Sequence, residues 1–221
     1  MPTRDEGPLT LETLDVDGAL QETAHEARSV LSRRGLLATA GLAVGGVPVA
    51  FAMAQGGGLP KGDIKILNYA LTLEYLEAAF YNGAVASGKY TGVVANFLSV
   101  VSAHENAHVA ALKATLGSDA IASPEFDFKG TNTGDVKTFL ATSKVLEDTG
   151  VSAYQGQADK IKTPAVLGSA GAILAVEARH ASWVRDIIGA DEISPAPDAF
   201  EAAMSMTEVL DAVKGTGFIK S

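Results

Sequence analysis

Apolar side chains recur every three or four positions along most of the chain after residue 62, which is the period of amphipathic helices. The pattern predicts four long helices and a shorter fifth one, at residues 63–86, 92–116, 135–160, 164–188 and 199–213. Asp63 and Thr163 are predicted N-caps, and Gly117 and Gly189 are predicted helix stops. No segment alternates apolar and polar residues over the length of a strand, so the predicted fold class is all-α.

The lengths of the connections predict how these helices are arranged. The first helix is joined tightly to the second, and the third to the fourth, so each pair must be antiparallel neighbours. The middle connection, "SDAIASPEFDFKGTNTG", has about 17 residues and is predicted to lack regular structure. Fully extended it could span roughly 55 Å, whereas a helix of about 25 residues is roughly 37 Å long. The chain is therefore predicted to form a four-helix bundle with one long crossover connection, plus a short C-terminal helix.

One glutamate interrupts the apolar face of each long helix. These residues are Glu74, Glu105, Glu147 and Glu177. An isolated buried carboxylate destabilises a fold by several kcal/mol unless it gains a proton or a partner. Four carboxylates that face one core need a shared cation, and two divalent ions would balance their charge.

A histidine follows two of these glutamates in an E-x-x-H motif, as His108 after Glu105 and His180 after Glu177. Side chains three positions apart lie on the same face of a helix. Each motif follows a lone glutamate on the preceding helix, at nearly the same distance along the chain, so the pattern is a weak internal duplication. The four glutamates and two histidines are the predicted ligands of a two-metal site.

Four neighbours of this pattern could support the ligands. Glu77 and His104 each lie one turn from a predicted ligand, where each could face the site or be a partly exposed residue. Tyr81 and Tyr154 each lie seven positions after a lone glutamate. Their hydroxyls could bind the carboxylates or find other partners in the core.

His104, Glu105 and His108 also form an H-E-x-x-H motif, which is typical of zinc metalloproteases. In such a site both histidines bind zinc and the glutamate is a general base. The elongated motif has glycine and histidine further on, where this chain has Val109–Ala111. This minor alternative leaves the other three glutamates and His180 unexplained.

The segments "LTLEYLEAAFY", "SAHENAHVAAL", "KVLEDTGVSAY" and "AVEARHASWVR" together resemble the ferritin-like superfamily over about residues 62–190. They are most similar to the exported ferritin-like family that includes desiccation-related proteins. The resemblance implies two iron ions, or alternatively manganese or no metal, with Glu105 and Glu177 as bridging ligands. It also implies reaction with O₂ or peroxide, such as iron oxidation or peroxide removal. The alternative is a non-catalytic bundle that protects against stress or desiccation, with a vestigial or structural metal site.

Composition narrows the possible partners and metals. The chain has no cysteine, which excludes disulfides, iron–sulfur clusters and thiolate zinc sites. A metal must then bind carboxylate, imidazole or backbone oxygen, which favours iron, manganese or zinc. The net charge of −9 argues against nucleic acid as a partner.

The first 54 residues resemble a twin-arginine export signal with a long polar N-terminus. They contain the pair Arg33 and Arg34, a Gly- and Ala-rich apolar run, and the small residues Ala52 and Ala54 at an A-x-A cleavage site. The resemblance implies recognition by the twin-arginine export machinery, which carries folded proteins, and a periplasmic or extracellular location. The alternative is an uncleaved membrane anchor, since residues 35–54 are about long enough to span a bilayer.

Four segments follow from this interpretation: the signal at 1–54, a linker at 55–62, the ferritin-like bundle at 63–190, and a C-terminal spacer and helix at 191–221. The final helix could cover the end of the bundle or make a contact in a homo-oligomer.

Overall fold

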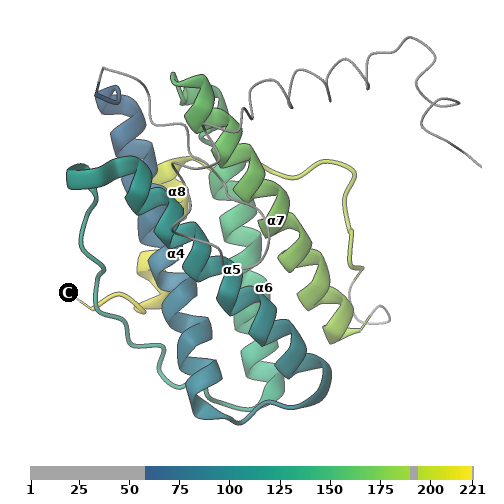
Figure 1. Cartoon of the computed structure of the whole chain (residues 1–221). Helices are drawn as coiled ribbons and strands as arrows, with labels where there is room; N and C mark the ends of the chain where they lie inside the picture. The colour runs from purple at the N-terminus through teal and green to yellow at the C-terminus, as the bar shows by residue number, and fades with distance from the viewer. Residues whose placement is uncertain (1–57, 190–193, 221) are drawn as a thin grey trace, which may run out of the picture. The chain divides into compact units, whose positions relative to one another are not determined.

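The structure is a computed structural model that describes residues 58–189 and 194–220. In this part of the chain four long α-helices form a bundle (Figure 1): α4 (Lys61–Ser87), α5 (Gly92–Leu116), α6 (Val136–Gln155) and α7 (Pro164–Ile188). The predicted export signal lies outside the described residues. No helix within those residues has both the length and the apolar character needed to span a bilayer.

The four helices pack most closely as two hairpins, α4 with α5 and α6 with α7. Gly88 has a left-handed backbone with φ of 62°, which lets α4 end and the chain turn at once into α5. The connection between α5 and α6 runs along the side of the bundle from one end to the other (Figure 1). The predicted all-α fold with one long crossover is therefore confirmed.

The long connection is more ordered than predicted. It contains a short 3₁₀ helix, η1 (Gly117–Asp119), and Phe126 forms an isolated β-bridge with Ile219 near the C-terminus. The amide of Asp127 donates a hydrogen bond of 2.8 Å to the carbonyl of Phe218. Phe128 is buried and packs edge to face on Phe218. A strand pairing with a distant segment leaves no local periodic signal, which is why the sequence pattern missed it.

The C-terminal helix begins later than predicted, since α8 spans Met206–Thr216. Its start is set by a capping box, in which Ser205 and Glu208 each accept a hydrogen bond from the backbone amide of the other. Val209 and Val213 are buried, and α8 packs against α6. Phe200, which the longer helix would place on its apolar face, is 91% exposed.

The third long helix also ends earlier than predicted, at Gln155, and a separate 3₁₀ turn, η2 (Ala158–Lys160), follows it. Gly156 lies where the C-terminal segment crosses this helix end. A Cβ atom at Gly156 would lie 1.8 Å from the carbonyl oxygen of Met204. The amide of Met204 in turn donates to the carbonyl of Ser152 at 3.1 Å.

The prediction that Asp63 caps its own helix is wrong. Helix α4 begins at Lys61, and Asp63 is fully buried at 0% exposure. Its carboxylate accepts hydrogen bonds of 2.9 Å from the backbone amides of Lys162 and Thr163, directly before α7. Thr163 occupies the N-cap position of α7 as predicted but makes no side-chain cap. Asp63 thus connects the start of α4 to the start of α7.

Replacing Asp63 with alanine should lower the free energy of unfolding by about 1–3 kcal/mol, because two amides lose a charged acceptor. Burial raises the pKa of Asp63, but the hydrogen bonds from Lys162 and Thr163 outweigh it and leave the pKa below its usual value. The stabilisation is therefore present above the unfolded pKa of about 3.9 and is lost as the pH falls through the folded pKa. Urea unfolding of both proteins from about pH 7 to pH 3 tests this.

The difference between wild type and Asp63→Ala should shrink over the acidic part of that range. Asp211→Ala removes an exposed aspartate from α8 and should change stability by less than about 0.5 kcal/mol. Equal stability of Asp63→Ala and wild type at neutral pH would contradict the role assigned to this carboxylate.

Candidate metal centre

The structure brings all six predicted ligands together in the bundle core. The four glutamates have no exposed surface, and the two histidines are 8% and 2% exposed. One helix of each hairpin contributes a single glutamate and the other contributes an E-x-x-H pair, as the duplication predicts. The residues are Glu74 from α4, Glu105 and His108 from α5, Glu147 from α6, and Glu177 and His180 from α7.

These side chains form two overlapping groups, and within each group the ligand atoms all lie within 4.8 Å of one another. The first group consists of Glu74, Glu105, His108 and Glu177. The second consists of Glu105, Glu147, Glu177 and His180. Each group could hold a metal ion, and the two shared glutamates are placed where they could bridge both ions.

The surroundings of His108 would suit a metal ligand, because one ring nitrogen lies close to three carboxylates. Its Nδ1 atom lies 3.2 Å from an oxygen of Glu74, 3.3 Å from one of Glu105 and 3.1 Å from one of Glu177. A ring nitrogen carries at most one hydrogen and cannot donate to three acceptors. The four atoms instead surround a common centre that a cation could occupy.

The second group shows the same feature more strongly. Nδ1 of His180 lies 3.1 Å from Oε1 of Glu105 and 3.3 Å from Oε2 of Glu147, yet none of these three atoms makes a hydrogen bond. Both carboxylate oxygens of Glu177 also lack a partner. Buried polar atoms without partners are rare because they cost about 1–3 kcal/mol each. A mixed carboxylate and imidazole set fits iron or manganese, so the residues present fit the metals that the sequence implies.

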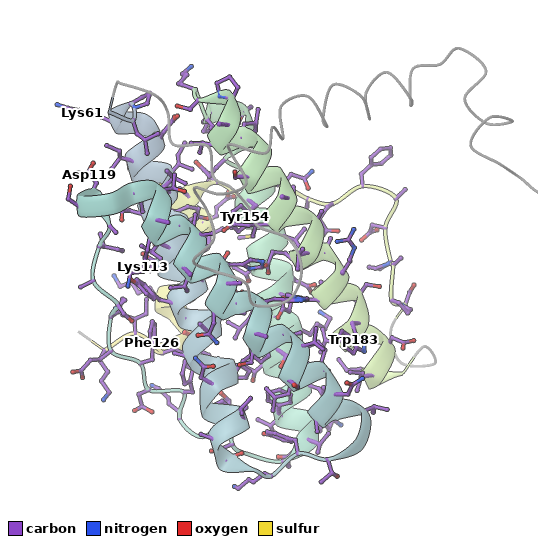
Figure 2. All side chains as sticks on the ribbon, viewed as in Figure 1. Lys61, Lys113, Asp119, Phe126, Tyr154 and Trp183 are labelled. Atoms are coloured by element: carbon purple, nitrogen blue, oxygen red, sulfur yellow. The ribbon has the colours of Figure 1, made fainter. Side chains whose placement is uncertain are left out.

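Two tyrosines connect the hairpins through the lone glutamates. The hydroxyl of Tyr81 donates a hydrogen bond to Oε1 of Glu147. The hydroxyl of Tyr154, labelled in Figure 2, donates to Oε1 of Glu74 at 2.5 Å. Burial, together with these glutamates, raises the pKa of both hydroxyls well above the usual value, so they remain donors. Each tyrosine therefore binds the glutamate of the other hairpin.

The electrostatics of the metal-free cluster show how strongly it needs positive charge. Burial raises the pKa of Glu74 to about 7, although His108 opposes the shift. Burial lowers the pKa of His180, but Glu105 and Glu147 outweigh it and raise the value to about 10. Both shifts favour the protonated form of the group, and metal ions would compete with these protons.

Glu77 is a fifth carboxylate beside the ligands. The sequence allowed it to face either the site or the surface, and the structure buries it at 3% exposure. Burial and the nearby glutamates raise its pKa well above the usual value. Gly150 on α6 makes room for it, because a Cβ atom there would lie 3.1 Å from Oε2 of Glu177 and 3.4 Å from Oε1 of Glu77. A glycine inside an amphipathic helix is the signal of this crowding in the sequence.

His104 does not lie where a metalloprotease requires it. Its side chain is exposed at the surface of α5, and its Nδ1 atom lies 2.8 Å from Nε2 of His180. It belongs to neither group of candidate ligands, whereas Glu105, the base of the protease motif, belongs to both. The geometry therefore does not support the H-E-x-x-H zinc site.

A protein-family model described as a ferritin-like domain matches residues 62–190. The match covers more than half of the chain and coincides with the bundle from α4 to α7. The chain belongs to this ferritin-like domain family. A comparison with curated proteins gave no match. The ferritin-like prediction is thus confirmed at the level of the fold and of a buried cluster that could bind metal.

Replacing Gly150 with alanine should weaken metal binding, because the new methyl group would press on Glu177 and Glu77. Overpacking of this kind costs about 1–3 kcal/mol, and the part of this strain that arises when Glu177 must hold its binding position lowers the affinity for metal. The affinity for Mn²⁺ should therefore fall by roughly 10-fold or more. Calorimetric titration of the metal-free protein with Mn²⁺ measures this.

Gly171→Ala is the matched control, since no atom lies within 4 Å of a Cβ atom at that exposed position of α7. It should raise the free energy of unfolding by up to about 1 kcal/mol and leave Mn²⁺ binding unchanged. If both glycine variants bind Mn²⁺ like wild type, Gly150 does not shape the site.

Proposed function

We propose that this protein binds two iron ions in its bundle and uses them in redox reactions with O₂ or peroxide, such as iron oxidation or peroxide removal. The observation that supports this best is the convergence of buried, unpartnered ligand atoms on Glu105, Glu147, Glu177 and His180. Four carboxylates and two neutral imidazoles match the charge of two divalent ions. Manganese is the alternative metal, because the same ligands suit it.

The chain's own residues would hold the ions and control their surroundings. Bound iron would supply the transfer of electrons to the oxidant. Tyr81 and Tyr154 would fix Glu147 and Glu74, because each hydroxyl holds one oxygen of its glutamate and so orients the whole carboxylate. The apolar core above and below the cluster would keep water away, and this strengthens every electrostatic interaction inside it.

An apolar cavity beside Tyr154 supports O₂ as the oxidant. Its walls come from α4, α5, α6, α7 and the segment before α7, and they include Ile66, Leu73, Leu112, Tyr154 and Ile173. A pocket with mostly apolar walls favours small apolar molecules over polar ones. O₂ is such a molecule, whereas peroxide is polar. Tyr154 lines the cavity and also binds Glu74, so this one residue connects the cavity wall with the candidate metal centre.

The second candidate is a non-catalytic, stress- or desiccation-protective bundle in which the metal has a structural role. The absence of any exposed surface on the four glutamates favours it, since ions held there would be shielded from large substrates. A structural metal would stabilise the fold by mass action without turnover.

Reconstitution with iron separates these candidates. The metal-free protein should bind two Fe²⁺ ions per chain under anaerobic conditions and then consume O₂ as the iron is oxidised. Glu105→Gln removes a charge from the glutamate shared by both groups, and this should reduce the oxidation rate at least about 100-fold. Glu201→Gln, which changes an exposed glutamate, should behave like wild type.

Each result has a distinct meaning. Fewer than one Fe²⁺ or Mn²⁺ ion per chain would overturn the metal-binding proposal. Two tightly bound ions that react with neither O₂ nor peroxide, but raise the unfolding temperature, would replace the redox proposal with the structural one.

We also propose that the chain is exported to the periplasm or beyond by the twin-arginine machinery. This proposal rests on the sequence alone, on Arg33, Arg34 and the Ala52–Ala54 cleavage pattern. These residues lie outside the part of the chain that the structure describes. In a bacterium that has this machinery, the exported protein should begin at Gln55. Replacing Arg33 and Arg34 together with lysine should leave at least about nine-tenths of it uncleaved in the cytoplasm. Mass spectrometry of the two fractions measures this, and normal export of the double variant would refute it.

A further inference from the structure

The two histidines of the candidate metal centre differ in what their second ring nitrogen contacts. Both present Nδ1 to the carboxylates. Nε2 of His180 lies 2.8 Å from Nδ1 of His104, with a ring-centroid distance of 5.1 Å and ring planes 17° apart. The two rings therefore meet edge to edge, as an N–H···N hydrogen bond requires. Nε2 of His108 has no such hydrogen-bond partner among the residues that the structure describes.

This contact allows only one arrangement of the protons on both rings when Nδ1 of His180 faces a metal ion. A neutral imidazole has one N–H group and one lone pair. If Nδ1 of His180 faces a metal ion, its proton must be on Nε2, and that N–H then donates to Nδ1 of His104. His104 in turn carries its own proton on Nε2, on the exposed side of α5. In that arrangement the hydrogen bond stabilises the tautomer of His180 that offers Nδ1 to the cluster, and it holds the plane of that ring.

The internal duplication is broken at the residue that makes this contact. His104 directly precedes Glu105 in the first E-x-x-H motif, and Val176 directly precedes Glu177 in the second. A valine cannot accept a hydrogen bond, so the second repeat has no means of orienting His108 in the same way. The two halves of the site therefore have matching ligands but unequal support.

We infer that His104 is a positioning residue that orients His180, and that it makes the group of Glu105, Glu147, Glu177 and His180 the tighter of two metal positions. The inference rests on the proposed metal site and deepens it. The hydrogen bond to His104 holds the plane of the His180 ring whether Nδ1 carries a proton or faces an ion, so the ring loses less freedom when an ion replaces that proton, and the acceptor increases the basicity of Nδ1. The two positions should then fill in sequence and not together.

The test is a titration of the metal-free full chain with Co²⁺. Calorimetry and the visible absorption of the bound ion both monitor the titration. Wild type should bind two ions in two distinguishable steps. His104→Val, which installs the residue of the second repeat, should weaken the tighter step by about 10- to 100-fold and leave the weaker step unchanged. His104→Gln keeps a carbonyl acceptor on the side chain and should recover most of the lost affinity.

Val176→Ala changes the corresponding position of the other repeat and should alter neither step by more than about 2-fold. Circular dichroism of each variant verifies that the bundle is folded. Losses of equal size at both steps in His104→Val, or no loss at either step, would overturn the inference. A wild-type chain that binds no Co²⁺, Fe²⁺ or Mn²⁺ would instead overturn the proposed function, so the two failures are distinguishable.

Discussion

Burial of several carboxylates in one helical core is the constraint on which the rest of this structure depends. Each charge withdrawn from water destabilises the fold by several kcal/mol unless hydrogen bonds or opposite charges offset it. Tyr81 and Tyr154 supply hydrogen bonds, and the histidines supply positive charge when they are protonated. Gly150 supplies space. The oxygen atoms that still lack hydrogen bonds mark where metal ions could bind, because one cation could satisfy several of them together.

The same cluster connects the two halves of the bundle. The helices pack more closely within each hairpin than between hairpins, so the contacts that cross between hairpins carry particular weight. Aromatic residues form one set of these contacts, as in the edge-to-face pair of Phe97 and Trp183. Trp183 is labelled near the end of α7 in Figure 2. The bonds from Tyr81 to Glu147 and from Tyr154 to Glu74 form the other. Metal ions that share ligands across the hairpins would reinforce this second set, so metal binding and bundle stability are linked.

Most of the fold and of the candidate site could be predicted because both depend on local spacing. A period of three to four residues fixes the buried face of a helix, and E-x-x-H places two ligands on that face. The contacts that were missed connect distant segments, such as Asp63 with the start of α7 and Phe126 with the C-terminal tail. The late start of α8 is different, since Ser205 and Glu208 form a local capping box that the sequence does display. There the local cap sets the start of the helix, and the apolar period before Ser205 does not extend it.

The buried carboxylates oppose folding until protons or metal ions offset their charge. This requirement links the proposed chemistry to the proposed export route. A cluster that needs protons or metal ions to be stable makes folding and metal loading parts of one equilibrium. A chain exported unfolded would have to assemble that cluster outside the cell, where the supply of metal differs. A route that carries folded proteins lets the metal be chosen where folding occurs. The twin arginine at Arg33 and Arg34 and the buried glutamates of the bundle therefore support the same order of events: folding with metal first, and translocation afterwards.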